Sequence, residues 1–105
     1  MTFKTVFAET AETDLRFVFE SVLDFSESFE DAIYVIKKIK ESAEKLKNPF
    51  VSGTTPYSAK IAKLGYRQIP ILNGSYLIFF KTEKVKRVRY IYYIKPTRMN
   101  YGLFF

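Results

Sequence analysis

The residues best suited to chemistry in this sequence are the bases and tyrosines between Asn73 and Arg98. This stretch is apolar, aromatic and strongly basic, and Glu83 is its single acid. The whole chain has no histidine and no cysteine, which excludes the commonest general base, a thiol nucleophile and a cysteine metal site. Any catalysis must therefore fall to Lys, Arg and Tyr, and the planar guanidinium of Arg is well shaped to bind phosphate.

The charge is divided sharply between the two halves of the chain. Residues 1–44 hold ten acids and five bases, whereas residues 45–105 hold one acid and twelve bases. The net charge of +6 is therefore −5 in the first part and +11 in the second. This asymmetry favours an anionic partner for the basic half, although solubilising charges on sheet edges would produce the same pattern. The carboxylates are too scattered to predict a metal site, and we expect no cofactor.

The length of 105 residues predicts one domain, residues 1–105, with a single core. Hydrophobic residues make up 48% of the chain and aromatic residues 18%, which predicts a folded protein rather than a disordered one. No apolar run reaches the roughly 18 residues that a membrane span needs. The N-terminus also lacks the apolar core of a secretory signal. We therefore expect a cytoplasmic protein with no membrane partner.

The first half predicts a strand followed by two helices. Thr2–Ala8 has the β-branched and aromatic content of a short strand. Thr10 or Thr13 is positioned to cap a first helix. Ser26 or Ser28 is positioned to cap a second. The apolar residues of the second helix recur at helical spacing, and Asn48-Pro49 ends it: Phe29, Ala32, Ile33, Ile36, Ile39, Ala43 and Leu46.

The second half predicts three strands after a loop over residues 48–60. Ile61–Leu72 forms the first, and Pro70 places part of it at a sheet edge or a bulge. Asn73-Gly74 is a strong hairpin signal. Ser75–Thr82 is continuously apolar, which predicts a central strand, and Val85–Pro96 follows after a short turn.

Strict alternation gives the last strand two faces. One face would hold Tyr90 and Tyr92, which we expect to lie under the helices. The other would present Arg87, Arg89 and Lys95 outward, as contacts for phosphate or for a protein partner or simply as a solvated face. Tyr93, on that same side, could stack on a nucleic-acid base or pack in the protein.

The element order is therefore β-α-α-β-β-β. Two helices joined by a short break form an antiparallel hairpin, and each has a one-sided apolar stripe that needs a covering layer. The strands of the second half supply this layer. The sequence predicts an α+β protein with a helical hairpin packed on one face of an antiparallel sheet.

The chain resembles the RelE/ParE superfamily of toxins from bacterial type II toxin–antitoxin systems. The likeness runs through "AETDLRFVFESVLDF", "AIYVIKKIKESAEKLKNPF" and "LGYRQIPILNGSYLIFFKTEKVKRVRYIYYIKPTR" in order. The resemblance implies a curved antiparallel sheet. It also implies action on translating ribosomes, by cutting mRNA, or on DNA gyrase, and neutralisation by a cognate antitoxin protein.

The resemblance also implies site residues. Arg67 matches a basic residue on the first strand of the sheet hairpin, Arg98 matches the arginine after the last strand, and Tyr101 stands near a C-terminal tyrosine. Ile69 occupies the place of a second basic residue, so the nuclease pattern is incomplete. The candidates for target or nucleic-acid binding are spread over the basic half: Arg67, Arg87, Arg89, Tyr93, Lys95 and Arg98.

Three functions stay open on the sequence. The first is a ParE-like toxin that arrests growth by inhibiting DNA gyrase or a similar machine. The second is a RelE-like ribosome-dependent mRNA endonuclease. The third, of a different class, is a non-enzymatic module that binds nucleic acid or protein on the same fold.

Overall fold

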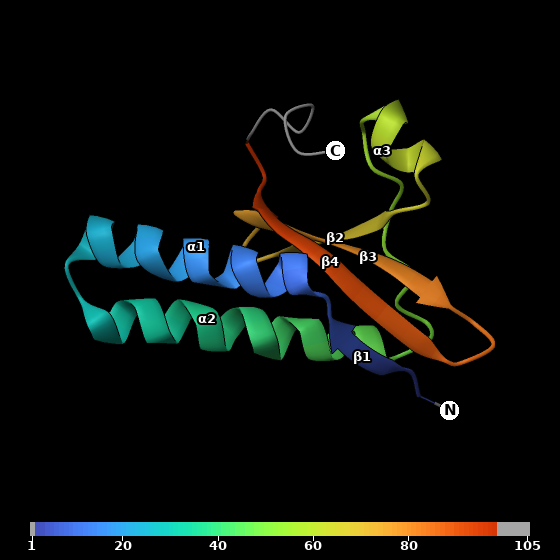
Figure 1. Ribbon diagram of the computed structural model, residues 1–105, viewed down its shortest axis with the longest axis horizontal. Coiled ribbons are helices and arrows are strands. Elements are labelled where there is room, and N and C mark those ends of the chain that lie inside the picture. The colour runs from blue at the N-terminus through green and yellow to red at the C-terminus, as the bar shows by residue number, and fades with distance from the viewer. Residues whose placement is uncertain (1, 99–105) are drawn as a thin grey trace.

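The computed structural model describes residues 2–98, which form a helical hairpin packed on a sheet (Figure 1). The expected α+β fold is confirmed. In these residues, no helix has the length and apolarity needed to cross a membrane. The elements follow in chain order: β1 (Lys4–Phe7), α1 (Glu9–Ser26), α2 (Phe29–Ala43), the 3₁₀ helix η1 (Glu44–Lys47), α3 (Ala59–Lys63), β2 (Arg67–Ile71), β3 (Tyr76–Glu83) and β4 (Val88–Pro96).

The sheet has the strand order β1-β4-β3-β2. The strands β2, β3 and β4 are antiparallel, as expected, and β3 is central. In contrast, β1 pairs with β4 in parallel, so the sheet is mixed. The chain enters β4 from the β3–β4 turn and β1 from the N-terminus at the same end of the sheet, which gives both strands one direction. Pro70 lies in the edge strand β2, where a missing backbone donor is tolerated.

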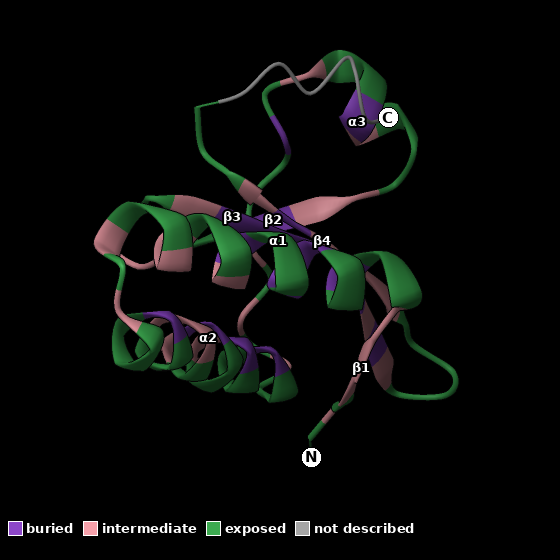
Figure 2. Cartoon of the chain, turned by 60° about the vertical axis from the view of Figure 1, so that its left-hand side comes forward, coloured by how far each residue is buried: buried purple, intermediate pink, exposed green. Residues whose placement is uncertain are grey.

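The main core lies between the hairpin and the sheet. Ser28 caps α2, where its side chain accepts a hydrogen bond from the Asp31 backbone N–H. The expected caps of α1 are wrong, because the helix starts at Glu9 and the Thr10 hydroxyl instead donates to the Tyr92 carbonyl. The buried core residues come from both layers (Figure 2): Ala11, Leu15, Val18, Ile39, Ala43, Leu46, Ile69, Ile71, Ile78, Phe80, Ile91 and Ile94.

A smaller core lies on the opposite face of the sheet, which we call the outer face. Ile61 from α3 packs there with Leu77 and Phe79. The expected strand over Ile61–Leu72 is therefore wrong at its start, where Ser58 caps α3 by accepting a hydrogen bond from the Ile61 N–H. The turn at Asn73-Gly74 is confirmed between β2 and β3.

The last strand departs from the expected alternation in two ways. It begins at Val88 rather than Val85, because residues 84–87 form a turn in which Arg87 has a φ of 55°. A bulge then interrupts its pairing with β3, since Phe79 pairs with Tyr93 whereas Phe80 pairs with Ile91. Tyr92 is the additional residue, and it shifts the alternation of side chains after this point.

Gly53 is held where its backbone approaches β2 closely. Its φ is +68°, and a Cβ atom there would lie 2.6 Å from the Gln68 backbone oxygen. We expect Gly53→Ala to lower the free energy of unfolding by about 2 kcal/mol, because it combines a left-handed backbone with an overlap. Gly74→Ala is the matched control: its φ is +82° with no atom within 4 Å, and it should cost about 1 kcal/mol. Urea unfolding measures the free energy of unfolding of both variants. Equal losses would contradict an overlap between a Cβ atom at position 53 and the Gln68 backbone oxygen.

Candidate functional site

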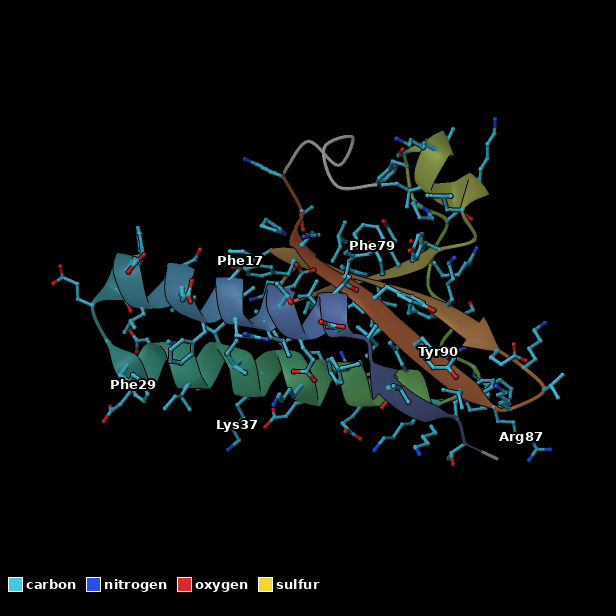
Figure 3. The ribbon with its side chains drawn as sticks, viewed as in Figure 1. Phe17, Phe29, Lys37, Phe79, Arg87 and Tyr90 are labelled. Carbon is cyan, nitrogen blue, oxygen red and sulfur yellow. The ribbon has the colours of Figure 1, made fainter. Side chains whose placement is uncertain are left out.

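The outer face of the sheet carries a cluster of aromatic side chains beside α3. The tyrosine cluster consists of Tyr66, Tyr90, Tyr92 and Tyr93. The Tyr66 ring meets Tyr92 at a centroid distance of 5.7 Å and Tyr93 at 5.9 Å, both edge to face. Tyr90 lies 6.3 Å from Tyr92 (Tyr90 is labelled in Figure 3). The bulge in β4 explains this gathering, because it brings the consecutive residues Tyr92 and Tyr93 to the same side.

Lys81 adds a positive charge to the tyrosine cluster. Its Nζ atom lies 4.4 Å from the centroid of Tyr66 and 5.7 Å from that of Tyr92. Lys81 pairs directly with Tyr90 across β3 and β4, which fixes its place on the outer face. A cation held over aromatic rings can contact a phosphate while the rings stack on bases.

The surroundings of Tyr66 perturb its ionisation. Burial raises the pKa of Tyr66 above its ordinary value of 10.0, and the neighbouring Tyr93 and Tyr92 raise it further. Tyr66 therefore keeps its proton at neutral pH, so its hydroxyl is a poor general base. Within the cluster this residue contributes packing and hydrogen bonding.

The late ionisation of Tyr66 can be measured. We expect absorbance at 295 nm during a pH titration to include a late component that ionises above pH 10, and we expect Tyr66→Phe to remove it. Because the folded-state pKa is raised, protonated Tyr66 stabilises the fold below pH 10, and this contribution is lost as the pH rises through the shifted value. Tyr57→Phe, at a tyrosine that is 99% exposed, should leave the late component in place. Loss of that component in the Tyr57 variant would refute the assignment.

The expected orientation of Arg89 is wrong. Arg89 is 4% exposed and points toward the helices. Its guanidinium donates to the backbone oxygens of Leu46 and Asn48 at 3.1 and 3.2 Å and lies over the rings of Phe3 and Phe80. Burial lowers the pKa of Arg89 below its ordinary value, yet the group stays cationic at neutral pH. Arg89 thus ties η1 and the following loop to the sheet.

Tyr90 and Tyr92 also lie on the face opposite to the expected one. They belong to the outer face and not to the core under the helices, because Arg89 and Ile91 take the helix-facing positions before the bulge. Strict alternation placed Arg89 with Arg87 on an outward face. In the structure, the Arg89 guanidinium faces the helices and donates to a carbonyl group at the end of η1.

Lys95 is largely covered rather than directed to solvent. Its Nζ lies 2.8 Å from Oδ1 of Asp14, and the two side chains are 12% and 6% exposed. Oδ2 of Asp14 accepts a hydrogen bond from the Ile94 N–H at 2.9 Å. The Asp14 carboxylate therefore joins α1 to β4 by two contacts. One of them is the ion pair with the Lys95 ammonium group.

Arg67 is engaged with the loop that precedes α3. Its guanidinium donates to the Gly53 carbonyl at 2.8 Å, to the Thr55 hydroxyl at 2.9 Å and to the Ser52 carbonyl at 3.2 Å. These three contacts orient the side chain along the loop at the edge of β2. A phosphate would have to compete with them for the same donors.

The other bases predicted as site residues lie at opposite ends of β4. Arg87 is exposed in the turn before the strand, and Arg98 is exposed just after it (Arg87 is labelled in Figure 3). Arg67 pairs with Phe80 in β3, whereas Pro96 pairs with Tyr76, so Arg67 and Arg98 are separated along the sheet by roughly 13 Å or more. Tyr101 lies outside the described residues. Arg67, Arg87 and Arg98 are therefore not brought together.

The sequence did not predict Tyr66 as part of the tyrosine cluster or Lys81 beside it. Tyr66 stood in the predicted strand over residues 61–72, and Lys81 at the end of an apolar run, with no motif to join them. The available signal was the number of tyrosines near the basic strands. Within residues 2–98, the described side chains also form no group of three that could hold a metal ion.

The overall fold of this chain is similar to that of other solved structures. A chain of the chromosomal ParDE toxin–antitoxin system from P. aeruginosa superposes with a TM-score of 0.75 over 91% of this chain and 97% of that chain. The sequence identity is 14%, so the likeness is one of fold. No protein-family model and no curated protein sequence matches this chain.

Proposed function

We propose that this chain is the toxin component of a type II toxin–antitoxin system. In this proposal it arrests growth in the ParE-like manner, by inhibiting DNA gyrase or a similar essential machine, and a cognate antitoxin neutralises it. The observation that carries the proposal is the fold likeness to a chain of a ParDE system, which extends over nearly the full length of both chains. The resemblance in the order of sequence segments supports the same class independently.

The side chains favour a non-nucleolytic toxin over a ribonuclease. RNA cleavage needs a base for the 2′-hydroxyl, charge stabilisation at the phosphate and an acid for the leaving oxygen, all within reach of one scissile bond. The chain lacks histidine, and Arg67 and Arg98 lie roughly 13 Å or more apart along the sheet. Tyr66, with its raised pKa, is a poor base. These properties fit a protein that acts by binding.

The charge and the sheet edges support an antitoxin partner. Residues 45–105 carry a net charge of +11, which an acidic chain would complement. Within residues 2–98, β1 is an edge strand whose outer side no other strand pairs. A partner can add a strand at such an edge while its acidic groups face the basic half.

Induced expression tests the toxin assignment. We expect growth of a bacterial host to stop after induction and to resume when the gene encoded beside this one is co-expressed. Continued growth at a confirmed level of folded protein would contradict the proposal and favour a non-enzymatic binding module.

The outer face supports a RelE-like mRNA endonuclease as the second candidate function. Tyr90, Tyr92 and Lys81 together offer ring faces and a cation to a single-stranded nucleic acid. Under this alternative, Lys81→Ala would weaken RNA binding, and mRNA would be cut on ribosomes. Under the ParE-like proposal, mRNA stays intact.

A further inference from the structure

The helical hairpin extends past the sheet that covers its base. The buried residues of α1 all lie in its first ten positions and end at Val18. The remaining part of α1 and the start of α2 project from the body, as the ribbon shows (Figure 1). Figure 2 shows this end of the hairpin as mostly exposed. The sheet therefore leaves the distal part of both apolar stripes uncovered.

Large apolar side chains occupy this projecting end. The distal patch consists of Phe19, Phe25, Phe29 and Ile33. Phe25 is 94% exposed, Phe29 60% and Ile33 48%. The rings of Phe19 and Phe29 meet edge to face at 5.4 Å, and a groove of about 520 Å³ begins beside them, lined in part by Phe19, Ile33 and Ile36. An apolar surface of this kind, grouped on one end of a molecule, marks a contact with a partner.

The charges at the tip of the hairpin have one sign, whereas Lys37 and Lys40 line the groove that begins beside Phe19. Residues 17–36 hold five acids and no base. All five acids are exposed: Glu20, Asp24, Glu27, Glu30 and Asp31. This rim repels nucleic-acid phosphates and anionic lipid, and it attracts a surface that carries Lys or Arg. The rim of the distal patch is therefore acidic, whereas residues 45–105 are basic. An acidic antitoxin would suit the basic residues and not the distal patch.

We propose that the distal patch is the surface by which the toxin holds its target, and that the target presents a protein groove that is apolar inside and basic at its rim. This inference rests on the proposed function as a toxin. The tip of the hairpin enters the groove with Phe25 and Phe29, while the acidic rim pairs with the bases around it. Target and antitoxin then use different ends of the molecule.

Truncation of the patch tests this inference. We expect Phe25→Ser combined with Phe29→Ser to require at least tenfold more protein per cell for growth arrest than the wild type does. Phe50→Ser is the matched control, because Phe50 is 93% exposed and lies outside the hairpin. It should arrest growth like the wild type. Thermal unfolding of each purified variant checks the fold.

Charge reversal distinguishes a basic protein target from other molecules that could bind the distal patch. We expect Glu20→Lys combined with Asp24→Lys to weaken growth arrest, because the rim would then repel a basic target. Glu9→Lys combined with Glu12→Lys makes the same change in net charge at the other end of α1 and should weaken it less. Stronger arrest in the Glu20/Asp24 variant would indicate an anionic occupant such as nucleic acid and would overturn the inference. A dimer of the wild type in sedimentation that the Phe25/Phe29 variant abolishes would assign the patch to a second copy and would overturn it too.

The two proposals fail in different ways. A wild-type chain that does not arrest growth removes the toxin function and this inference with it. A wild-type chain that arrests growth, together with a Phe25/Phe29 variant of equal potency, removes the distal patch as the target surface and leaves the toxin function standing.

Discussion

Asp14→Ala should lower the free energy of unfolding by about 4 kcal/mol, the largest loss that we expect from a single substitution. The Asp14 side chain is 6% exposed, and its two oxygens bind the Lys95 ammonium and the Ile94 N–H. Alanine removes the carboxylate that neutralises a largely buried ammonium group, and it leaves a backbone donor of β4 without its acceptor. Urea unfolding monitored by circular dichroism measures the loss.

Two controls isolate the buried pair. Thr13→Ala changes the exposed neighbour of Asp14 and should alter stability by less than about 0.5 kcal/mol. Lys95→Met in the Asp14→Ala background should restore part of the loss, because it removes the charge left behind. A double variant that is less stable than Asp14→Ala alone would show that burial of the Lys95 charge is not the cause.

Arg89→Met should lower the free energy of unfolding by about 3 kcal/mol. Methionine can fill much of the volume between Phe3 and Phe80, but it cannot donate to the carbonyl groups of Leu46 and Asn48. These acceptors lie where η1 ends, so the loop after the helical hairpin should loosen first. Hydrogen exchange of residues 44–50 would register this loosening beside the global loss in urea unfolding.

Arg87→Met is the matched control for Arg89, two residues away on the same segment. Arg87 is exposed in the turn before β4, so its replacement should change stability by less than about 0.5 kcal/mol. Equal effects of the two substitutions would contradict the structural role of Arg89. A large effect of Arg87→Met on growth arrest with little effect on stability would place Arg87 in a binding surface.

The features predicted well from the sequence are those set by local chemistry. Ser28 caps α2 because its side-chain oxygen accepts a backbone N–H within its own turn. Asn73-Gly74 turns the chain because both residues tolerate positive φ, and Pro70 lies on an edge because it lacks a donor. The stripe predicted for α2 is confirmed at Ala32, Ile39 and Ala43, which are buried, but it is wrong at Phe29 and Ile33, which are 60% and 48% exposed because the sheet does not reach them. Such signals need no knowledge of the rest of the chain.

The features predicted wrongly depend on contacts between distant segments. A bulge at Tyr92 reverses the alternation of β4, so tyrosines expected in the core reached the outer face. Arg89 turned inward because η1, more than 40 residues earlier, presents carbonyl groups to it. The parallel pairing of β1 with β4 likewise joins the two ends of the described chain. No periodicity within a single strand contains this information.

For the candidate site, too, the local features were predicted and the contacts between distant segments were not. The sequence predicted a basic and aromatic sheet face, and the outer face carries Tyr93 with three further tyrosines. It did not predict Lys81 over Tyr66, because the two meet only after β3, β4 and the start of β2 are assembled. The residues carried over by family resemblance, Arg67 and Arg98, lie apart from each other in the structure.

The most direct test of the central claim is the fate of mRNA and DNA after induced expression. If the chain is a toxin that acts without cutting RNA, growth should stop while ribosome-associated mRNA stays intact and DNA-damage signalling rises. Arg98→Ala should leave that mRNA pattern unchanged. Cleavage of mRNA on ribosomes, abolished by Arg98→Ala and without DNA-damage signalling, would contradict the account and identify a ribonuclease instead.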